Sequence, residues 1–201
     1  MANGRVITGF SSPKVAVYSA TGTNVSYASN TALARGVNVE ISPEVGDDNI
    51  FYADNVAAEN SAGTFTGGTL KLTVDGLKDE ARKLIYGLPT PTKVTVDSKQ
   101  VDVYDYDDDM EIPYVGVGFV VRMQSDGVVE YVPMLLTKCR FKINSTSAET
   151  QGESINWQTS ELEATIMRDD TAKHCWKRVG VGQTSEAEAI AVIDAILGAA
   201  S

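Results

Sequence analysis

The segment from Pro113 to Arg168 limits the possible folds of this chain more than any other part. It contains three successive runs in which apolar residues alternate with polar residues or glycine, and only short polar breaks separate them. Alternation with a period of two is typical of a β-strand that buries one face. One face of the first run carries Val115, Val117, Phe119, Val121 and Met123. Strands that follow one another so closely pair as antiparallel neighbours, so the segment predicts a mainly β fold.

Two further expectations come from the same segment. Gly116 and Gly118 alternate with the apolar residues of the first run, and glycine inside a strand indicates a bend or the close approach of another group. In the second run Cys139, Phe141 and Ile143 share a face, opposite Lys and Arg side chains. We therefore expect Cys139 to be a buried thiol that does not react in the native state.

The chain has 201 residues and a formal net charge of −10. Proteins that grip nucleic acid through its phosphates need clustered Lys and Arg, so this charge disfavours such a function. No apolar run approaches the roughly 20 residues of a membrane-spanning helix, and we expect a soluble protein. The first residues lack the features of a secretory signal, so we expect the chain to stay in the compartment that makes it. Its two cysteines are too few for a disulfide framework and are expected to be reduced.

Three regions of the chain differ in composition. Residues 1–36 are rich in Ser, Thr, Asn, Gly and Ala, which predicts an N-terminal arm with one or two weak strands. Residues 37–172 hold the alternating runs and predict an antiparallel β-sandwich or barrel. Residues 173–201 form a C-terminal segment. The fold class expected from the whole chain is mainly β (α+β), with terminal arms.

The central region contains a predicted loop and a predicted helix. Residues 43–68 are rich in acidic residues, Asn and Gly, and we expect a long loop there. Loops of this length in compact domains are usually functional or disordered. Over residues 76–86 the apolar period changes to 3.6, which predicts one flanking helix with Asp75 as its N-cap and Gly87 at its end.

Local signals predict two more elements. Ser185 and Glu188 have the spacing of a capping box, so a terminal helix is expected over residues 186–197. Residues 92–105 contain two short alternating runs and predict a β-hairpin.

An acidic run follows this hairpin and is the strongest local concentration of charge. It does not fit a calcium-binding EF-hand loop, because Met110 occupies the position that needs Gly and Gly116 the position that needs a bidentate Glu. A looser divalent-cation site is an alternative, but a solvated hairpin tip or a charged surface facing a partner is favoured. We call this run the acidic surface, and its residues are Asp102, Asp105, Asp107, Asp108, Asp109 and Glu111.

The sequence contains no residue pattern that is typical of catalysis. His174 is the single histidine, and neither Ser nor Cys stands in a nucleophile-elbow context. One His beside Cys175 cannot make a zinc site. Gly180 and Gly182 precede a helix, but too little chain follows to complete a βαβ nucleotide-binding unit. We therefore expect a protein that is not an enzyme and that holds no cofactor and no metal ion.

The order of several motifs resembles one known family. These motifs are FYADN in the expected loop, TGGTLKLTVDGLKDEARKLIYGL at the strand and helix, PYVGVGFVVRM, and LTKCRFKINSTSAETQGESINWQTSELEATIM. Over roughly residues 35–170 they are similar to the major tail proteins of long-tailed, non-contractile bacteriophages, in particular to the tail-tube subunits of the phi13-like group. The matches are matches of pattern and include no catalytic signature.

The resemblance implies a β-sandwich with a flanking helix whose copies join sheet to sheet into hexameric rings, which stack into a tail tube. Such a tube surrounds a tape-measure protein, meets tail terminator and distal tail proteins, and lets phage DNA pass without specific binding. The protein would be made in the bacterial host cytoplasm and reside in the virion. We expect the acidic surface to face a partner or to line the lumen. We expect an inter-ring contact at Ile50, Phe51, Tyr52, Asp54 and Asn55.

Two other functions remain open at this point. The same features fit a subunit of a phage-like effector-delivery tube. A non-enzymatic carbohydrate-binding or adhesin β-module is a further alternative, which the missing secretory signal disfavours. Self-assembly separates these classes, because a tube subunit forms rings or tubes on concentration, whereas a lectin stays a small oligomer with affinity for sugars.

Overall fold

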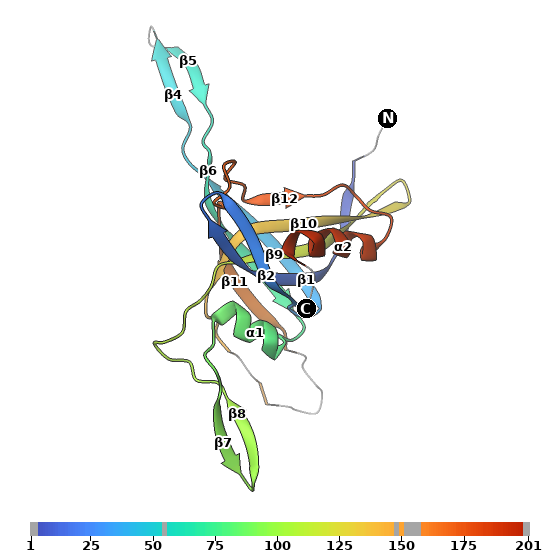
Figure 1. The fold of residues 1–201 in the computed structure, drawn as a ribbon. Helices are drawn as coiled ribbons and strands as arrows, with labels where there is room; N and C mark the ends of the chain where they lie inside the picture. The colour runs from blue at the N-terminus through green and yellow to red at the C-terminus, as the bar shows by residue number, and fades with distance from the viewer. Residues whose placement is uncertain (1–3, 54–55, 147–148, 151–157, 199–201) are drawn as a thin grey trace.

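Antiparallel β-strands form most of the structure, a computed structural model that describes residues 4–53, 56–146, 149–150 and 158–198 (Figure 1). The strands are β1 (Val6–Thr21), β2 (Asn24–Ala32), β3 (Gly36–Val45), β4 (Asn49–Ala53), β5 (Val56–Ser61), β6 (Phe65–Val74), β7 (Thr92–Val96), β8 (Lys99–Val103), β9 (Val115–Ser125), β10 (Val128–Phe141), β11 (Ser160–Met167) and β12 (Lys177–Val179). The helices are α1 (Asp79–Tyr86) and α2 (Glu186–Leu197). The predicted mainly β, antiparallel fold is confirmed.

The main sheet has eight strands and is strongly curled. Seven strands follow in the order β2-β1-β9-β10-β11-β6-β3, and β12 pairs with β10 beside β11. Bulges bend the long strands, for example between Ser11 and Lys14 of β1. The curl brings β1 close to β3, since a Cβ atom on Gly36 would lie 2.2 Å from the Phe10 ring. The end strands β2 and β3 do not pair over the residues described, so the sheet does not close into a barrel there.

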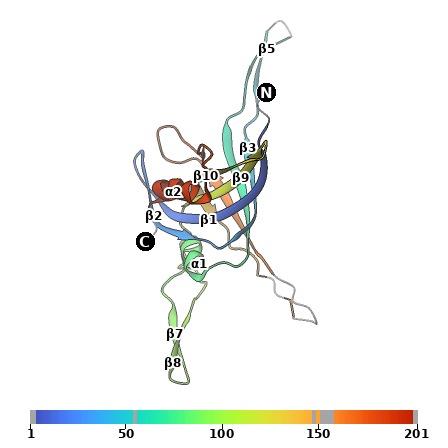
Figure 2. The same cartoon turned by 90° about the vertical axis from the view of Figure 1, so that its right-hand side faces the viewer.

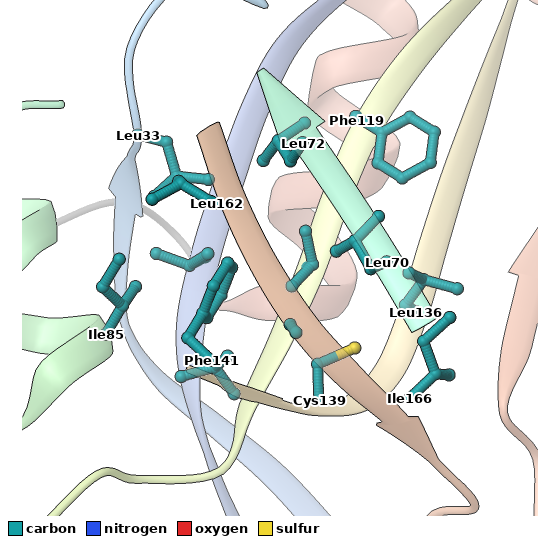
Figure 3. Packing of buried hydrophobic residues seen from close by; sticks show 14 of the residues in the cluster. Leu33, Leu70, Leu72, Ile85, Phe119, Leu136, Cys139, Phe141, Leu162 and Ile166 are labelled. Atoms are coloured by element: carbon teal, nitrogen blue, oxygen red, sulfur yellow. The ribbon is translucent and has the colours of Figure 1, made fainter. Parts of the chain in front are cut away.

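The main hydrophobic core lies on the inner face of the curled sheet (Figure 3). Its buried side chains come from β6, β9, β10 and β11, and Ile85 of α1 packs against them. Cys139 and Phe141 are both buried, which confirms the expected burial of Cys139, and burial raises the pKa of its thiol. Ile143 was predicted on the same face but is 58% exposed, because β10 ends at Phe141 and the chain leaves the sheet.

Helix α2 packs on the other face of the sheet, over β9 and β10 (Figure 2). α2 packs directly against Gly116 and Gly118, where there is no room for a side chain. A Cβ atom on Gly118 would lie 2.4 Å from Ile193, and one on Gly116 would lie 2.9 Å from Leu197. The predicted close approach at these glycines is therefore confirmed. The sequence predicts one buried face for β9, whereas both faces are buried, because α2 covers the second.

The N-terminal region is part of the main sheet. The sequence predicts an arm with weak strands over residues 1–36, but β1 lies between β2 and β9 and is 16 residues long. Val15 and Ala16 of β1 are fully buried. The bulge between Ser11 and Lys14 explains the difference, because it shifts the alternation of buried and exposed residues within one strand.

The terminal helix agrees with its prediction. α2 spans Glu186–Leu197, and its capping box is formed, with the Glu188 N–H donating to the Ser185 hydroxyl at 3.3 Å. Neither helix that the structure describes combines the length and the apolar character needed to cross a membrane.

Helix α1 begins later than predicted. It starts at Asp79 rather than at residue 76, and Lys78 precedes it without a side-chain cap. Asp75 was predicted as the N-cap, but its carboxylate accepts hydrogen bonds from the backbone and side chain of Arg35 instead. Gly87 ends the helix as predicted, with φ 59 in the left-handed region.

Two β-hairpins project from the main sheet toward opposite ends of the molecule (Figures 1 and 2). The β4–β5 hairpin connects β3 to β6. Residues 43–68 are therefore not the predicted long loop, because their Asn- and Gly-rich composition conceals two short paired strands. The β7–β8 hairpin follows α1 and confirms the prediction for residues 92–105.

Candidate assembly surfaces

One face of the β7–β8 hairpin is apolar and exposed. Strand pairing sets Val94 opposite Val101 and Val96 opposite Lys99, so four valines share one face. We call this the valine face, and its residues are Val94, Val96, Val101 and Val103. Their side chains are between 40% and 53% exposed. Asp97 and Ser98, both with positive φ, make the tight turn at the tip.

Among the described strands, none pairs with the β7–β8 hairpin from outside, and its four valines remain about half exposed. β7 and β8 form a sheet of two strands, and such a hairpin alone is marginally stable in water. A hydrogen bond from Thr92 to Asp105 closes its root at 2.7 Å. Exposed apolar faces with unpaired strand edges are typical of sites where another chain binds.

The acidic surface lies at the root of this hairpin and along the segment that leads to β9. All six of its carboxylates are exposed. Lys83 of α1 lies over the Tyr104 ring, 4.6 Å from its centroid, and the Tyr104 hydroxyl helps raise the pKa of Lys83. The described residues contain no group of three or more His, Cys, Asp or Glu side chains placed to hold a metal ion. That the acidic surface lines the lumen of a tube stays a prediction.

Strand β4 of the β4–β5 hairpin contains three of the five predicted inter-ring residues. Its backbone pairs Ile50 with Asn60 and Phe51 with Glu59. Asp54 and Asn55 lie outside the described residues, and so do the side chains of Ile50, Phe51 and Tyr52. The structure therefore places Ile50, Phe51 and Tyr52 in a strand of a projecting hairpin, and the predicted inter-ring contact stays a prediction.

A small apolar groove lies between α2 and β12. We call it the α2–β12 groove, and it has a volume of about 140 Å³. Its lining residues are Pro133, Met134, Leu135, Arg178, Val179, Gly180, Val192, Ile193 and Ile196. Val179 at its edge is 55% exposed, and the neighbouring Val181 is 82% exposed. Sequence patterns did not reveal the groove, because three segments that are distant in the chain build it.

Arg178 of this groove is held loosely by a buried carboxylate. Asp169 is buried, and its Oδ1 accepts hydrogen bonds from the backbone N–H groups of Thr171 and Cys175. Its Oδ2 lies 3.8 Å from Arg178 and has no hydrogen-bond donor within the described part of the chain. Since the Arg178 side chain is also 43% exposed, it can meet a second carboxylate from outside.

His174 and Trp176 lie in the segment between β11 and β12, and both contact other residues of the fold. His174 adopts a positive φ, and its Nδ1 lies 3.3 Å from the Asp169 carbonyl oxygen in the same loop. Trp176 stacks on Phe65, with ring centroids 4.4 Å apart. These contacts fasten the loop between β11 and β12 to the start of β6.

The end strands of the main sheet leave backbone groups unpaired. β2 pairs with β1 alone and β3 with β6 alone among the described strands. Unpaired strand edges recruit other strands unless they are covered. β2 and β3 are therefore candidate edges for sheet-to-sheet contact between copies.

No known protein-family model matches this chain, and no curated protein matches it.

Proposed function

We propose that this chain is a structural virion protein, the subunit of a phage tail tube. In this function its copies form hexameric rings that stack around a tape-measure protein and make the conduit for DNA ejection. Tail terminator and distal tail proteins bind the ends of the tube. The resemblance of the sequence to major tail proteins supports this function.

The placement of the two hairpins is the observation that carries the proposal. They project to opposite ends, and one of them exposes the valine face without a partner (Figure 1). A contact between two different surfaces of identical chains is heterologous, and it propagates into rings or open polymers. A tube of stacked rings needs contacts of this kind along its axis.

The free edges of the main sheet support ring formation. β2 of one copy and β3 of the next can pair, which removes the unpaired edges of both. Closure of several curled sheets in this way gives a continuous barrel around a lumen.

The charge of the chain supports passage of DNA rather than binding. A net charge of −10 repels a polyanion, and six carboxylates are concentrated on the acidic surface. An inner wall rich in Asp, Glu and small polar side chains lets the genome slide. A tube structure with basic side chains along its bore would rule out this conduit.

Concentration of the purified protein tests the proposal. We expect sedimentation velocity to reveal a shift from monomer to large particles, and negative-stain electron microscopy to show rings or tubes of one diameter. A protein that stays monomeric or dimeric at every accessible concentration contradicts the proposed function. Glycan-array binding by such a small oligomer would favour the adhesin alternative.

A further inference from the structure

We propose that the valine face of one copy docks into the α2–β12 groove of a second copy. The inference rests on the proposed self-assembly and names the two surfaces that meet. The hairpin cannot reach the groove of its own chain, because it points away from α2 at the lower end of the molecule (Figure 1). The occupant is therefore another copy of this chain.

The outer side of α2 is suited to an apolar partner. α2 lies on the surface of the single chain although most of its residues are apolar. Its acidic residues are Glu186 and Glu188 in the first turn and Asp194, whose carboxylate accepts hydrogen bonds from Lys14 and Asn30. The residues that α2 exposes after its first turn are Ala191 and Ala195, and Val192 and Ile196 beside them are partly exposed. Small alanine side chains let the backbone of a flat β-hairpin approach closely. Val179 also lines the groove and is 55% exposed.

The groove has opposite charges at its two ends. Arg178 pairs with Leu135 in the β10–β12 ladder, and Leu135 and Leu197 both flank Gly118. Arg178 therefore lies toward the C-terminal end of α2. Glu188 is exposed in the first turn, at the N-terminal end of the helix. The positive end of the groove is thus separated from the negative end by the length of α2.

The valine face carries the complementary arrangement of charges. Lys99 lies at its tip, opposite Val96. Asp105 lies at its root, where it accepts the hydrogen bond from Thr92. When the valines fill the groove with Asp105 at Arg178, Lys99 points toward Glu188. Complementary charges at the rim set the orientation of a contact more than its strength.

Cysteine pairs in separate copies test this contact. One preparation carries Val101→Cys, the other carries Val192→Cys, and the two are mixed under assembly conditions and oxidised. We expect a disulfide-linked dimer on a non-reducing gel. The matched control replaces Val101→Cys by Lys93→Cys, on the opposite face of the hairpin. We expect loss of the dimer in this control, to the background that the native Cys175 gives.

The outcomes separate this inference from the proposed function. If the wild-type chain assembles but Val101→Cys gives no more dimer than Lys93→Cys, the docking inference is wrong and the tube proposal stands. If the wild-type chain does not assemble at all, the proposed function fails first. Sedimentation of the uncrosslinked mixtures verifies that each variant still assembles.

A double-mutant cycle on Asp105→Asn and Arg178→Gln tests the orientation. Asparagine keeps the acceptor for Thr92, so the hairpin root is retained. We expect each single change to raise the concentration needed for assembly, and the double variant to need no more than the worse single one. If the double variant raises the concentration needed for assembly by the product of the two single effects, Asp105 and Arg178 do not interact and the proposed orientation is wrong. Thermal melting verifies that Arg178→Gln, beside Asp169, remains folded.

Discussion

The inner strand β6 and the projecting strand β7 look alike in sequence but differ in what covers them. Leu70 and Leu72 alternate with polar residues just as Val94 and Val96 do. Leu70 and Leu72 are at most 1% exposed because β9, β10, β11 and α1 surround the core, whereas the valines remain about half exposed. Alternation thus defines an apolar face, but only the fold decides whether the same chain covers it.

This difference separates stability from assembly. Side chains in the core contribute to the free energy of unfolding of a single chain, because their burial exists in the monomer. The valine face contributes little to that free energy, because we expect it to be buried only when a partner binds. Substitutions in the two regions should therefore change different measured quantities.

The largest expected effect on stability is that of Phe141→Ala. Phe141 is 2% exposed and lies in the main core. Its truncation removes buried apolar surface and leaves a cavity, so we expect a loss of about 3–5 kcal/mol in the free energy of unfolding. Urea denaturation followed by tryptophan fluorescence measures it. A loss below about 1 kcal/mol would place Phe141 outside the core.

Gly118→Val should have the next largest effect. The new side chain must displace Ile193 of α2, whose Cγ2 would lie 2.4 Å from the added Cβ. Overpacking of this kind costs about 1–3 kcal/mol. Urea denaturation measures the loss, and limited proteolysis reports release of α2. Gly76→Ala is the matched control, since no atom lies within 4 Å of its added Cβ. Equal losses of unfolding free energy in the two variants would contradict the close packing of α2 on Gly118.

Asp170→Asn should have a smaller effect that depends on pH. Lys138 at 2.7 Å, and then the Tyr18 hydroxyl, hold the pKa of Asp170 below its usual range. A carboxyl whose pKa is lower in the folded state stabilises fully above its unfolded pKa of about 3.9, and this contribution is lost as pH falls through the folded value.

The stability difference between wild type and Asp170→Asn should therefore be constant near neutral pH and shrink on acidification below about pH 4. Exposed ion pairs typically contribute roughly 0.2–1 kcal/mol, which bounds the effect. Denaturation curves at several pH values measure it. A difference that grows as the pH falls would show that the Lys138 contact does not stabilise the fold.

The smallest expected change in stability is that of the double variant Val94→Thr and Val101→Thr. Threonine keeps the β-branched shape, and both positions are half exposed. We expect the free energy of unfolding to change by less than about 0.5 kcal/mol. The same variant should lose assembly in sedimentation experiments. A large loss of monomer stability would mean that the valine face packs within its own chain.

The elements that the sequence predicted correctly depend on neighbouring residues. Ser185 and Glu188 make their capping box within one helical turn, and the β7–β8 hairpin is complete within a short segment. The length of β1 and its place inside the main sheet were not predicted, because its bulges, with Ser12 at φ 54, break the alternation on which the prediction depends.

The surfaces were less predictable than the elements. Gly118 indicated a close approach, but nothing near it in the sequence identifies Ile193 as the group that approaches. The α2–β12 groove likewise combines β10, β12 and α2, so it exists only after long-range pairing. The acidic surface was predictable because six carboxylates stand together in one segment.

The position of the groove in the chain has a consequence during synthesis. The β7–β8 hairpin is made from the middle of the sequence and can form as soon as residues 92–103 have left the ribosome, since hairpins close in microseconds. The groove needs α2, which follows the β7–β8 hairpin in the chain and is translated after it. A nascent chain can therefore present the valine face before it can offer the α2–β12 groove. In the proposed contact, nascent chains that still lack α2 therefore cannot link to each other.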